Sequence, residues 1–183
     1  PGFRLAKETN RRMVCMSNQR QLSLAWTFYA EDNDAKFCSS APGIETTVEW
    51  SAESWIAWQG GMNPSEDWTP DDWKCSIQEG ALWDYIQDEE VYRCPAGEKN
   101  EQITYASSPS MGWRSGKLAY VSNPEYGEIS YKMTQLRQSG TRVIYIEEGE
   151  LTPDFYIVHY TEEQWIDQPP GQQVGRQGHG RLR

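Results

Sequence analysis

Residues 3–33 read FRLAKETNRRMVCMSNQRQLSLAWTFYAEDN, and this stretch decides the fold. It contains neither glycine nor proline, and most of its residues are good helix formers. In its second half, apolar residues recur at helical steps along one face, and these are Cys15, Leu22, Ala25, Trp26 and Tyr29. We therefore predict one continuous helix from Leu5 to Asp32, with the last four of these residues buried against a sheet.

The first half of this helix is basic instead of apolar. Five bases and one acid give residues 1–20 a net charge of +4. At ~1.5 Å per residue the helix is about 45 Å long, which is more than a small domain covers, so this half is expected to project. The basic side chains of the projecting half are expected to face an acidic partner or an anionic membrane surface. The structural alternative is a solvated helix face. These basic side chains include Arg4, Lys7, Arg11 and Arg12.

The rest of the chain is strongly acidic. The 183 residues carry a net charge of -10, and residues 174–183 add +3 to the +4 of the N-terminal segment, so the stretch between them carries -17. Such a body repels phosphate groups, and we expect no nucleic-acid partner. No apolar run in the sequence reaches the roughly 18 residues of a membrane-spanning helix.

Beyond the helix, the pattern predicts one α+β domain. Residues 36–80 are rich in Trp, Ser, Gly and Pro and are expected to form a long irregular insertion, with brief strands at 48–50 and 55–58 at most. A short helix or turn is expected at 81–85, an extended piece at 91–95, and short strands at 103–106, 118–121, 129–133, 142–147 and 155–160. We predict a single domain, 1–183, in which a helix over 1–33 lies on the antiparallel sheet of a globular head over 34–183.

Catalytic chemistry has little support in the sequence. Neither a Gly-x-Ser-x-Gly nucleophile motif nor a phosphate-binding glycine loop is present. His159 stands within a predicted strand and is interpreted as a structural histidine. Glu147 and Glu148 are neighbours that point to opposite faces of a strand, so they do not converge on one bond. We expect a protein that is not an enzyme and needs no cofactor.

Two other groups of residues allow a functional and a structural interpretation. Asp32 and Asp34 in the polar turn after the helix, or acids of the 67–72 loop, offer oxygen ligands for calcium, and a solvated turn is the structural alternative. Five tryptophans crowd into residues 50–73 and either line a sugar-binding surface or fill the core. Those proposed for the sugar surface are Trp50, Trp55 and Trp58.

The four cysteines contain no Cys-x-x-Cys pair and lie far from both histidines, which disfavours a zinc site. Their even number favours two disulfides in an oxidising compartment. Four buried thiols in a cytosolic protein are the alternative.

Several segments, in their order along the chain, resemble one known family. They are AKE (6–8), RRMVCMSNQRQL (11–22), EDND (31–34), GALWDYI (80–86), VYRCPA (91–96) and SYKM (130–133). Together they are similar to prepilin-type pseudopilin-like proteins, of the type II secretion and type IV pilin class of planctomycetes, verrucomicrobia and their relatives. The chain departs from the family's terminal pattern of His, nine residues and Asp-Gly, because it reaches Gly178-His179-Gly180 and stops at Arg183.

The resemblance implies a structural subunit of a type II secretion or type IV pilus-like assembly, which contacts other pilin-like subunits through its N-terminal helix. It also implies a hydrophobic segment before Pro1 that anchors the precursor in the inner membrane, and a head in the periplasm or outside the cell. Without that segment, the chain is expected to be monomeric or weakly associated. The alternative function is a secreted carbohydrate-binding module that uses the Trp cluster.

The resemblance further implies a disulfide pairing. Four cysteines allow three pairings, and the family's recurring cysteines stand at the positions of Cys15 and Cys94. With these two joined, Cys38 and Cys75 form the second disulfide, at the two ends of the Trp-rich region.

Overall fold

The computed structural model describes residues 2–40, 53–57, 68–97, 101–108, 111–112, 130–136, 144–147, 158–159 and 164–165. The elements in these ranges are α1 (Gly2–Asp32), α3 (Pro70–Gln78), α4 (Trp83–Ile86), β1 (Tyr105–Ser107), β2 (Tyr145–Glu147), β3 (Val158–His159) and β4 (Gln164–Trp165). Two short 3-10 helices accompany them, η1 (Glu89–Tyr92) and η3 (Met133–Gln135).

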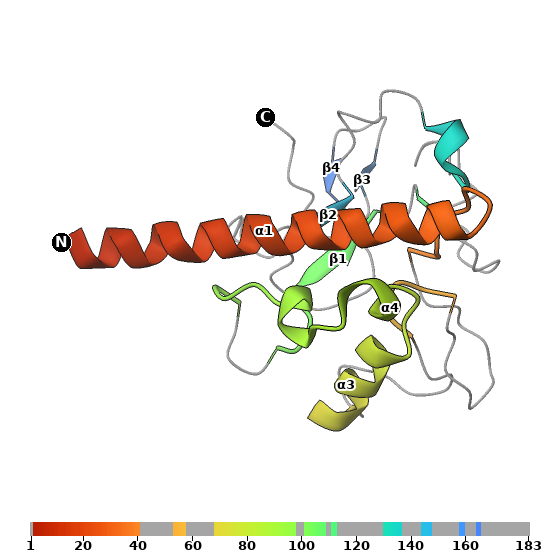
Figure 1. The fold of residues 1–183 in the computed structure, drawn as a ribbon. Helices are drawn as coiled ribbons and strands as arrows, with labels where there is room; N and C mark the ends of the chain where they lie inside the picture. Colours follow the sequence, from red (N-terminus) through yellow and green to blue (C-terminus); the bar gives the residue numbers. More distant parts are fainter. Residues whose placement is uncertain are drawn as a thin grey trace.

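Helix α1 runs without a break for 31 residues, which confirms the predicted N-terminal helix. In Figure 1 it crosses the molecule and extends past the body at its N-terminal end. It stops in the expected polar turn, where Asp34 and Ala35 adopt left-handed backbone angles with φ of 56° and 61°. There the Asn33 side-chain amide donates to the Tyr29 carbonyl at 2.8 Å, which satisfies one of the last helical acceptors.

Aromatic side chains from distant segments meet one another in the core, beside aliphatic residues such as Leu22 and Leu82. Trp26 of α1 makes edge-to-face contacts with Phe37 and Tyr145, at centroid distances of 6.3 and 5.7 Å. Trp55 stacks on Tyr92 at 6.0 Å and meets the edge of Tyr145 at 5.2 Å. Because each such ring buries about 150–250 Å², a chain with few aliphatic residues can still close a core.

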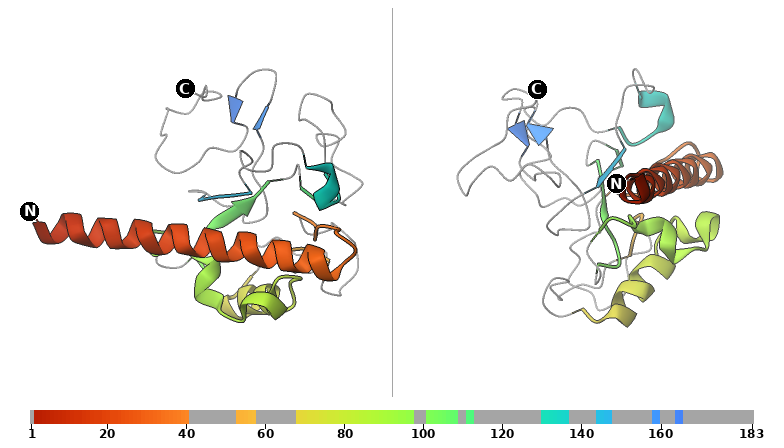
Figure 2. Two further views of the ribbon diagram at one scale, coloured as in Figure 1. Left: turned by 45° about the horizontal axis from the view of Figure 1, so that its top comes forward. Right: turned by 90° about the vertical axis from the view of Figure 1, so that its left-hand side faces the viewer.

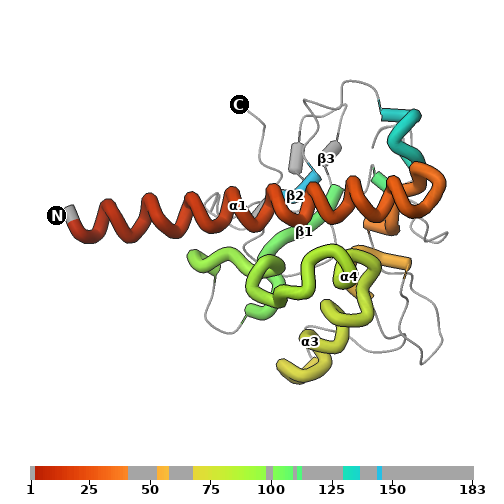
Figure 3. The backbone as a smooth tube through the Cα atoms, in the orientation of Figure 1, coloured from red at the N-terminus to blue at the C-terminus, as the bar shows by residue number. Residues whose placement is uncertain are grey.

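Elements from distant parts of the sequence cover the C-terminal half of α1. Helix α4 and η1 contact one side of it, and β2 contacts it as well. Seen along α1 from its N-terminus, α3 and α4 lie below the helix and the β3–β4 pair lies above it (Figure 2). The backbone trace shows how little of the body reaches the N-terminal end of α1 (Figure 3).

Helix α3 corrects the prediction that residues 36–80 are irregular throughout. Thr69 is its N-cap: the Thr69 hydroxyl accepts from the Asp72 backbone N–H, and the Asp72 carboxylate accepts from the Thr69 backbone N–H at 2.8 Å. Pro70 stands in the first turn, where its missing N–H costs nothing. The Thr-Pro-Asp-Asp sequence read as a loop is therefore a capping box.

The β structure is limited to short pairs. Strands β1 and β2 are antiparallel, with Ala106 opposite Ile146, and β3 pairs antiparallel with β4, with His159 opposite Gln164. The coarser prediction, a long N-terminal helix with other structure against it, is confirmed. These pairs of three and two residues do not show the expected antiparallel sheet beneath the helix.

Several local predictions were wrong in type. Residues 91–92 belong to the 3-10 helix η1, and only Arg93 after them is extended, with φ of -125° and ψ of 133°. Residues 55–57 form no strand, and residues 133–135 form η3 instead of continuing a strand. The predicted strands at 48–50 and 118–121, and the outer parts of those at 142–147 and 155–160, lie outside the described residues.

Candidate interaction site on the N-terminal helix

Helix α1 consists of two halves with opposite environments. Every residue from Phe3 to Val14 is exposed, and Asn18 is the first buried residue of the helix whose burial is described. In the second half, Leu22, Ala25, Trp26 and Ala30 are buried and Tyr29 is half-buried beside them. The helix is thus held at one half only, and the other half is an exposed surface about 20 Å long.

The exposed half carries apolar side chains on more than one side. Phe3 is 89% exposed, and Leu5, Met13 and Met16 are each at least 65% exposed. Since successive helical residues turn by about 100°, Phe3 and Leu5 point to nearly opposite sides. Exposed apolar side chains on two sides of a helix can contact more than one neighbouring helix.

The same half is rich in uncompensated positive charge. Arg4 forms an exposed ion pair with Glu8 at 3.7 Å, which is worth only a few tenths of a kcal/mol at this spacing. Among the described residues, no ion pair involves Lys7, Arg11 or Arg12. All three side chains are exposed, and what they contact stays a prediction.

Asn18 lies where the exposed and buried halves of α1 meet, and it binds the helix to the body. Its side-chain amide donates to the carbonyls of Glu90 and Arg93, at 3.0 and 2.9 Å, and it is only 7% exposed. One helical turn earlier, the Tyr105 hydroxyl donates to the Cys15 carbonyl at 3.4 Å. These contacts fix where the helix leaves the body. The sequence analysis did not single out Asn18, although an amide in line with Cys15 and Leu22 was a signal for it.

Cys15 and Cys94 lie at this same junction. Cys15 precedes Asn18 by one helical turn, and Asn18 binds the carbonyl of Arg93, the residue before Cys94. Cys94 is buried, and its backbone N–H donates to the Thr104 hydroxyl at 2.6 Å. The Tyr105 hydroxyl donates to the Cys15 sulfur at 3.3 Å and the Ala96 backbone N–H to the Cys94 sulfur at 3.3 Å, and the predicted pairing stays a prediction.

The second predicted pairing joins Cys38 and Cys75. Cys38 is buried in the core, where its backbone closely faces Gly112. Cys75 is exposed, because α3 turns the neighbouring Ser76 and Ile77 toward the interior. Cys38 and Cys75 therefore differ in burial, and their pairing stays a prediction.

Trp55 cannot belong to a sugar-binding surface, because its side chain is 0% exposed and lies between Tyr92 and Tyr145. This part of the alternative interpretation was wrong, and Trp55 fills the core. Trp50 and Trp58 lie outside the described residues. Trp68 and Trp73 contact each other edge-to-face at 4.7 Å and are half-buried.

The two carboxylates proposed as calcium ligands have other contacts. The Tyr85 hydroxyl donates to the Asp32 carboxylate at 3.0 Å, and burial together with this carboxylate raises the pKa of Tyr85 to about 12. Asp34 forms an ion pair with Lys36 at 3.7 Å. Within the described ranges, no three His, Cys, Asp or Glu side chains gather as metal ligands. Of the helices described, none is long and apolar enough to cross a membrane.

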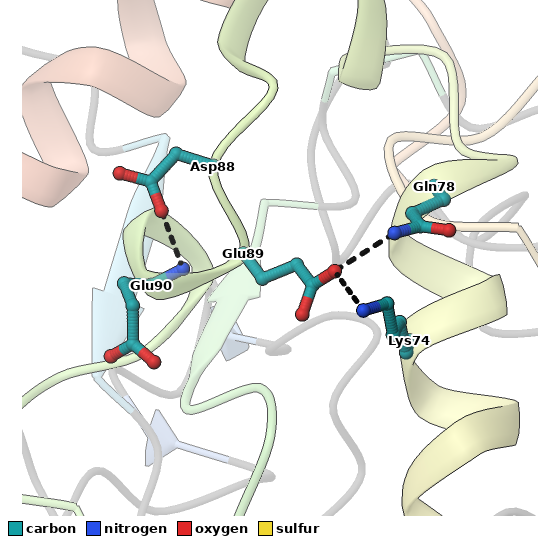
Figure 4. A network of polar contacts seen from close by, with 5 residues as sticks. All are labelled: Lys74, Gln78, Asp88, Glu89 and Glu90. Atoms are coloured by element: carbon teal, nitrogen blue, oxygen red, sulfur yellow. Dashed lines mark hydrogen bonds and ion pairs between the residues drawn. The ribbon is translucent and has the colours of Figure 1, made fainter.

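An acidic surface covers α3, α4 and η1. Residues 68–97 contain seven acids and two bases. One acid, Glu89, accepts from Lys74 at 3.2 Å and from Gln78 at 2.8 Å, and Figure 4 shows this carboxylate between the two side chains. The other acids of this surface are Asp71, Asp72, Glu79, Asp84, Asp88 and Glu90.

Comparison of the chain with protein-family models, with curated proteins and with solved structures finds no match.

Proposed function

We propose that this chain is a non-catalytic, pilin-like subunit of a type II secretion or type IV pilus-like assembly. The observation that carries the proposal is the division of α1: one half is buried in the body and the other is a fully exposed helix. Exposed apolar residues cost little to keep in water one at a time, but a row of them on a projecting helix favours association with other helices. The proposed architecture is a pilin-like α+β head carried by such a helix.

The quoted family segments support this proposal at the positions where the structure gives them roles. Asn18 of the helix segment meets the 91–96 segment, because its side chain donates to the Arg93 carbonyl. Tyr85 of the 80–86 segment binds Asp32 of the turn segment. Two pairs of motifs far apart in the sequence are therefore in contact, as expected if they serve one common architecture.

In this proposal the head lies in the periplasm or outside the cell, and a membrane anchor belongs to the same polypeptide before α1. Arg4, Lys7, Arg11 and Arg12 meet anionic headgroups before assembly, each contributing around 1 kcal/mol near such a surface. The neighbouring subunits then contact the apolar residues of the exposed half.

Photo-crosslinking in the source cell tests the proposal. A photoreactive residue at Met13 or Met16, in the chain expressed with its own preceding coding sequence, is expected to link subunits into a ladder of multimers in the cell envelope. The matched control is the same residue at Tyr131, which is 43% exposed but lies in the head. Multimers from Tyr131 only, or a protein that stays in the cytosol, contradict the proposal.

A further inference from the structure

Opposite charges gather on two separate parts of this molecule. The exposed half of α1 carries four bases and one acid between residues 3 and 14, whereas residues 68–97 carry seven acids and two bases. The bases are all exposed, and so are Asp71, Glu79, Asp84, Asp88 and Glu90. Each copy of the chain therefore has an exposed basic segment, residues 3–14 of α1. It also has an acidic surface, formed by residues 68–97.

The acidic surface keeps most of its charge. Lys74 is engaged with Glu89, and the Asp88 carboxylate accepts from the Glu90 backbone N–H at 3.0 Å, which leaves its negative charge in place (Figure 4). The Asp72 carboxylate is held by the Thr69 hydroxyl and backbone N–H, and these hydrogen bonds lower the pKa of Asp72. The Asp72 carboxylate is therefore ionised at neutral pH.

Apart from the exposed Arg4–Glu8 pair, no base of residues 3–14 has an acidic partner among the described residues. Arg11 and Arg12 precede Asn18, where the body begins, by a turn and a half or more, and α1 is straight and continuous there (Figure 1). The basic segment of one copy is attracted to the acidic surface of another copy, because their charges are opposite. Two basic segments repel each other. The apolar side chains of Met13 and Met16 stand among these bases and add contact area.

We propose that the exposed half of α1 docks on the acidic α3–η1 surface of a second copy. The contact is head-to-tail, with different surfaces on the two copies, so it can repeat along a filament. It rests on the proposed function, because it assigns one of the subunit contacts of that assembly. Exposed ion pairs are individually weak, so in the isolated chain the contact is detectable at low salt and lost at high salt.

Charge reversal in the purified 183-residue chain tests the docking by sedimentation. At about 10 mM salt we expect self-association that weakens at least tenfold at about 150 mM, where screening shortens the reach of charges. Arg11→Glu with Arg12→Glu is expected to abolish it, and so is Glu79→Lys with Glu90→Lys. Mixing the two variants is expected to restore association, because the unaltered basic segment of the second variant then meets the unaltered acidic surface of the first.

The control is Lys36→Glu with Lys132→Glu, which changes the net charge as much as the arginine reversal but lies near the other end of α1. It is expected to associate at least tenfold more tightly than the arginine variant. Equal association of these two variants, failure of mixing to restore it, or binding to anionic vesicles without any self-association overturns the docking. If multimers still form from Met13 and Met16 in the cell, only the acidic contact fails and the proposed function stands.

Discussion

The two halves of α1 have similar backbone geometry and opposite surroundings. In the C-terminal half, Trp26 is 1% exposed and contacts Phe37 and Tyr145, whereas Phe3 in the N-terminal half is 89% exposed. The same type of helix therefore serves as part of the core over one stretch and as a free surface over the other. Both halves form a helix, so helix formation does not explain which half is buried. Burial depends on which segments of the head pack against the helix.

The largest difference between the two halves is expected in the free energy of unfolding, when one aromatic side chain in each half is truncated. Trp26→Ala removes a buried ring and is expected to lower the free energy of unfolding by about 3–5 kcal/mol. Phe3→Ala is expected to change it by less than about 0.5 kcal/mol. Urea denaturation followed by circular dichroism measures both, and similar losses from the two changes contradict the division of α1.

The predicted Cys15–Cys94 disulfide sharpens the comparison at the boundary between the halves. It closes a loop of about 80 residues and is expected to contribute about 2–4 kcal/mol, mainly by restricting the unfolded chain. Non-reducing peptide mapping identifies the linkage, and denaturation with and without reductant measures its effect. A Cys15–Cys38 linkage, or four reduced thiols in protein taken from the cell envelope, overturns the pairing.

Asn18 is expected to matter less than the core but more than any residue of the exposed half. Asn18→Ala leaves the carbonyls of Glu90 and Arg93 without their side-chain donor, which costs about 1–3 kcal/mol. Asn10→Ala, the same change at an exposed position of the same helix, serves as the control. If the two variants unfold at the same urea concentration, Asn18 does not hold the junction.

The smallest effect is expected at α3, where an exposed capping box can be compared with the exposed half of α1. Thr69→Ala is expected to cost about 1 kcal/mol, whereas Thr9→Ala changes little. Thermal unfolding of the two variants at neutral pH measures the difference.

The same cap predicts a pH dependence. Hydrogen bonds from Thr69 lower the pKa of Asp72 in the folded state. The contribution of the Asp72 carboxylate to the free energy of unfolding is therefore complete above its pKa in the unfolded chain, about 3.9. The contribution is lost as the pH falls through the lower, folded pKa. The stability difference between the natural chain and Asp72→Asn is therefore expected to shrink below about pH 4. A difference that grows on acidification contradicts this assignment.

Much of α1 was predictable because its signals are local. The absence of Gly and Pro predicted the helix, the three- and four-residue spacing predicted the burial of Leu22, Ala25 and Trp26, and the lack of apolar spacing before Cys15 predicted the projecting half. Helix α3 was predictable as well, since Thr69-Pro70-Asp71-Asp72 contains a cap, a first-turn proline and the reciprocal acid. It was missed because the same residue types also mark turns.

The sequence alone thus determined the length of α1, its charged and apolar halves, and the acidic character of the body, because spacing, propensity and charge are properties of neighbouring residues. Only the tertiary structure decided that Trp55 is a core residue, that Asn18 binds η1 and Arg93, and that Cys75 faces outward while Cys38 is buried. The contacts of Trp55 and Asn18 join residues 37 to 90 positions apart, and local patterns carry no information about which distant segment fills a given space.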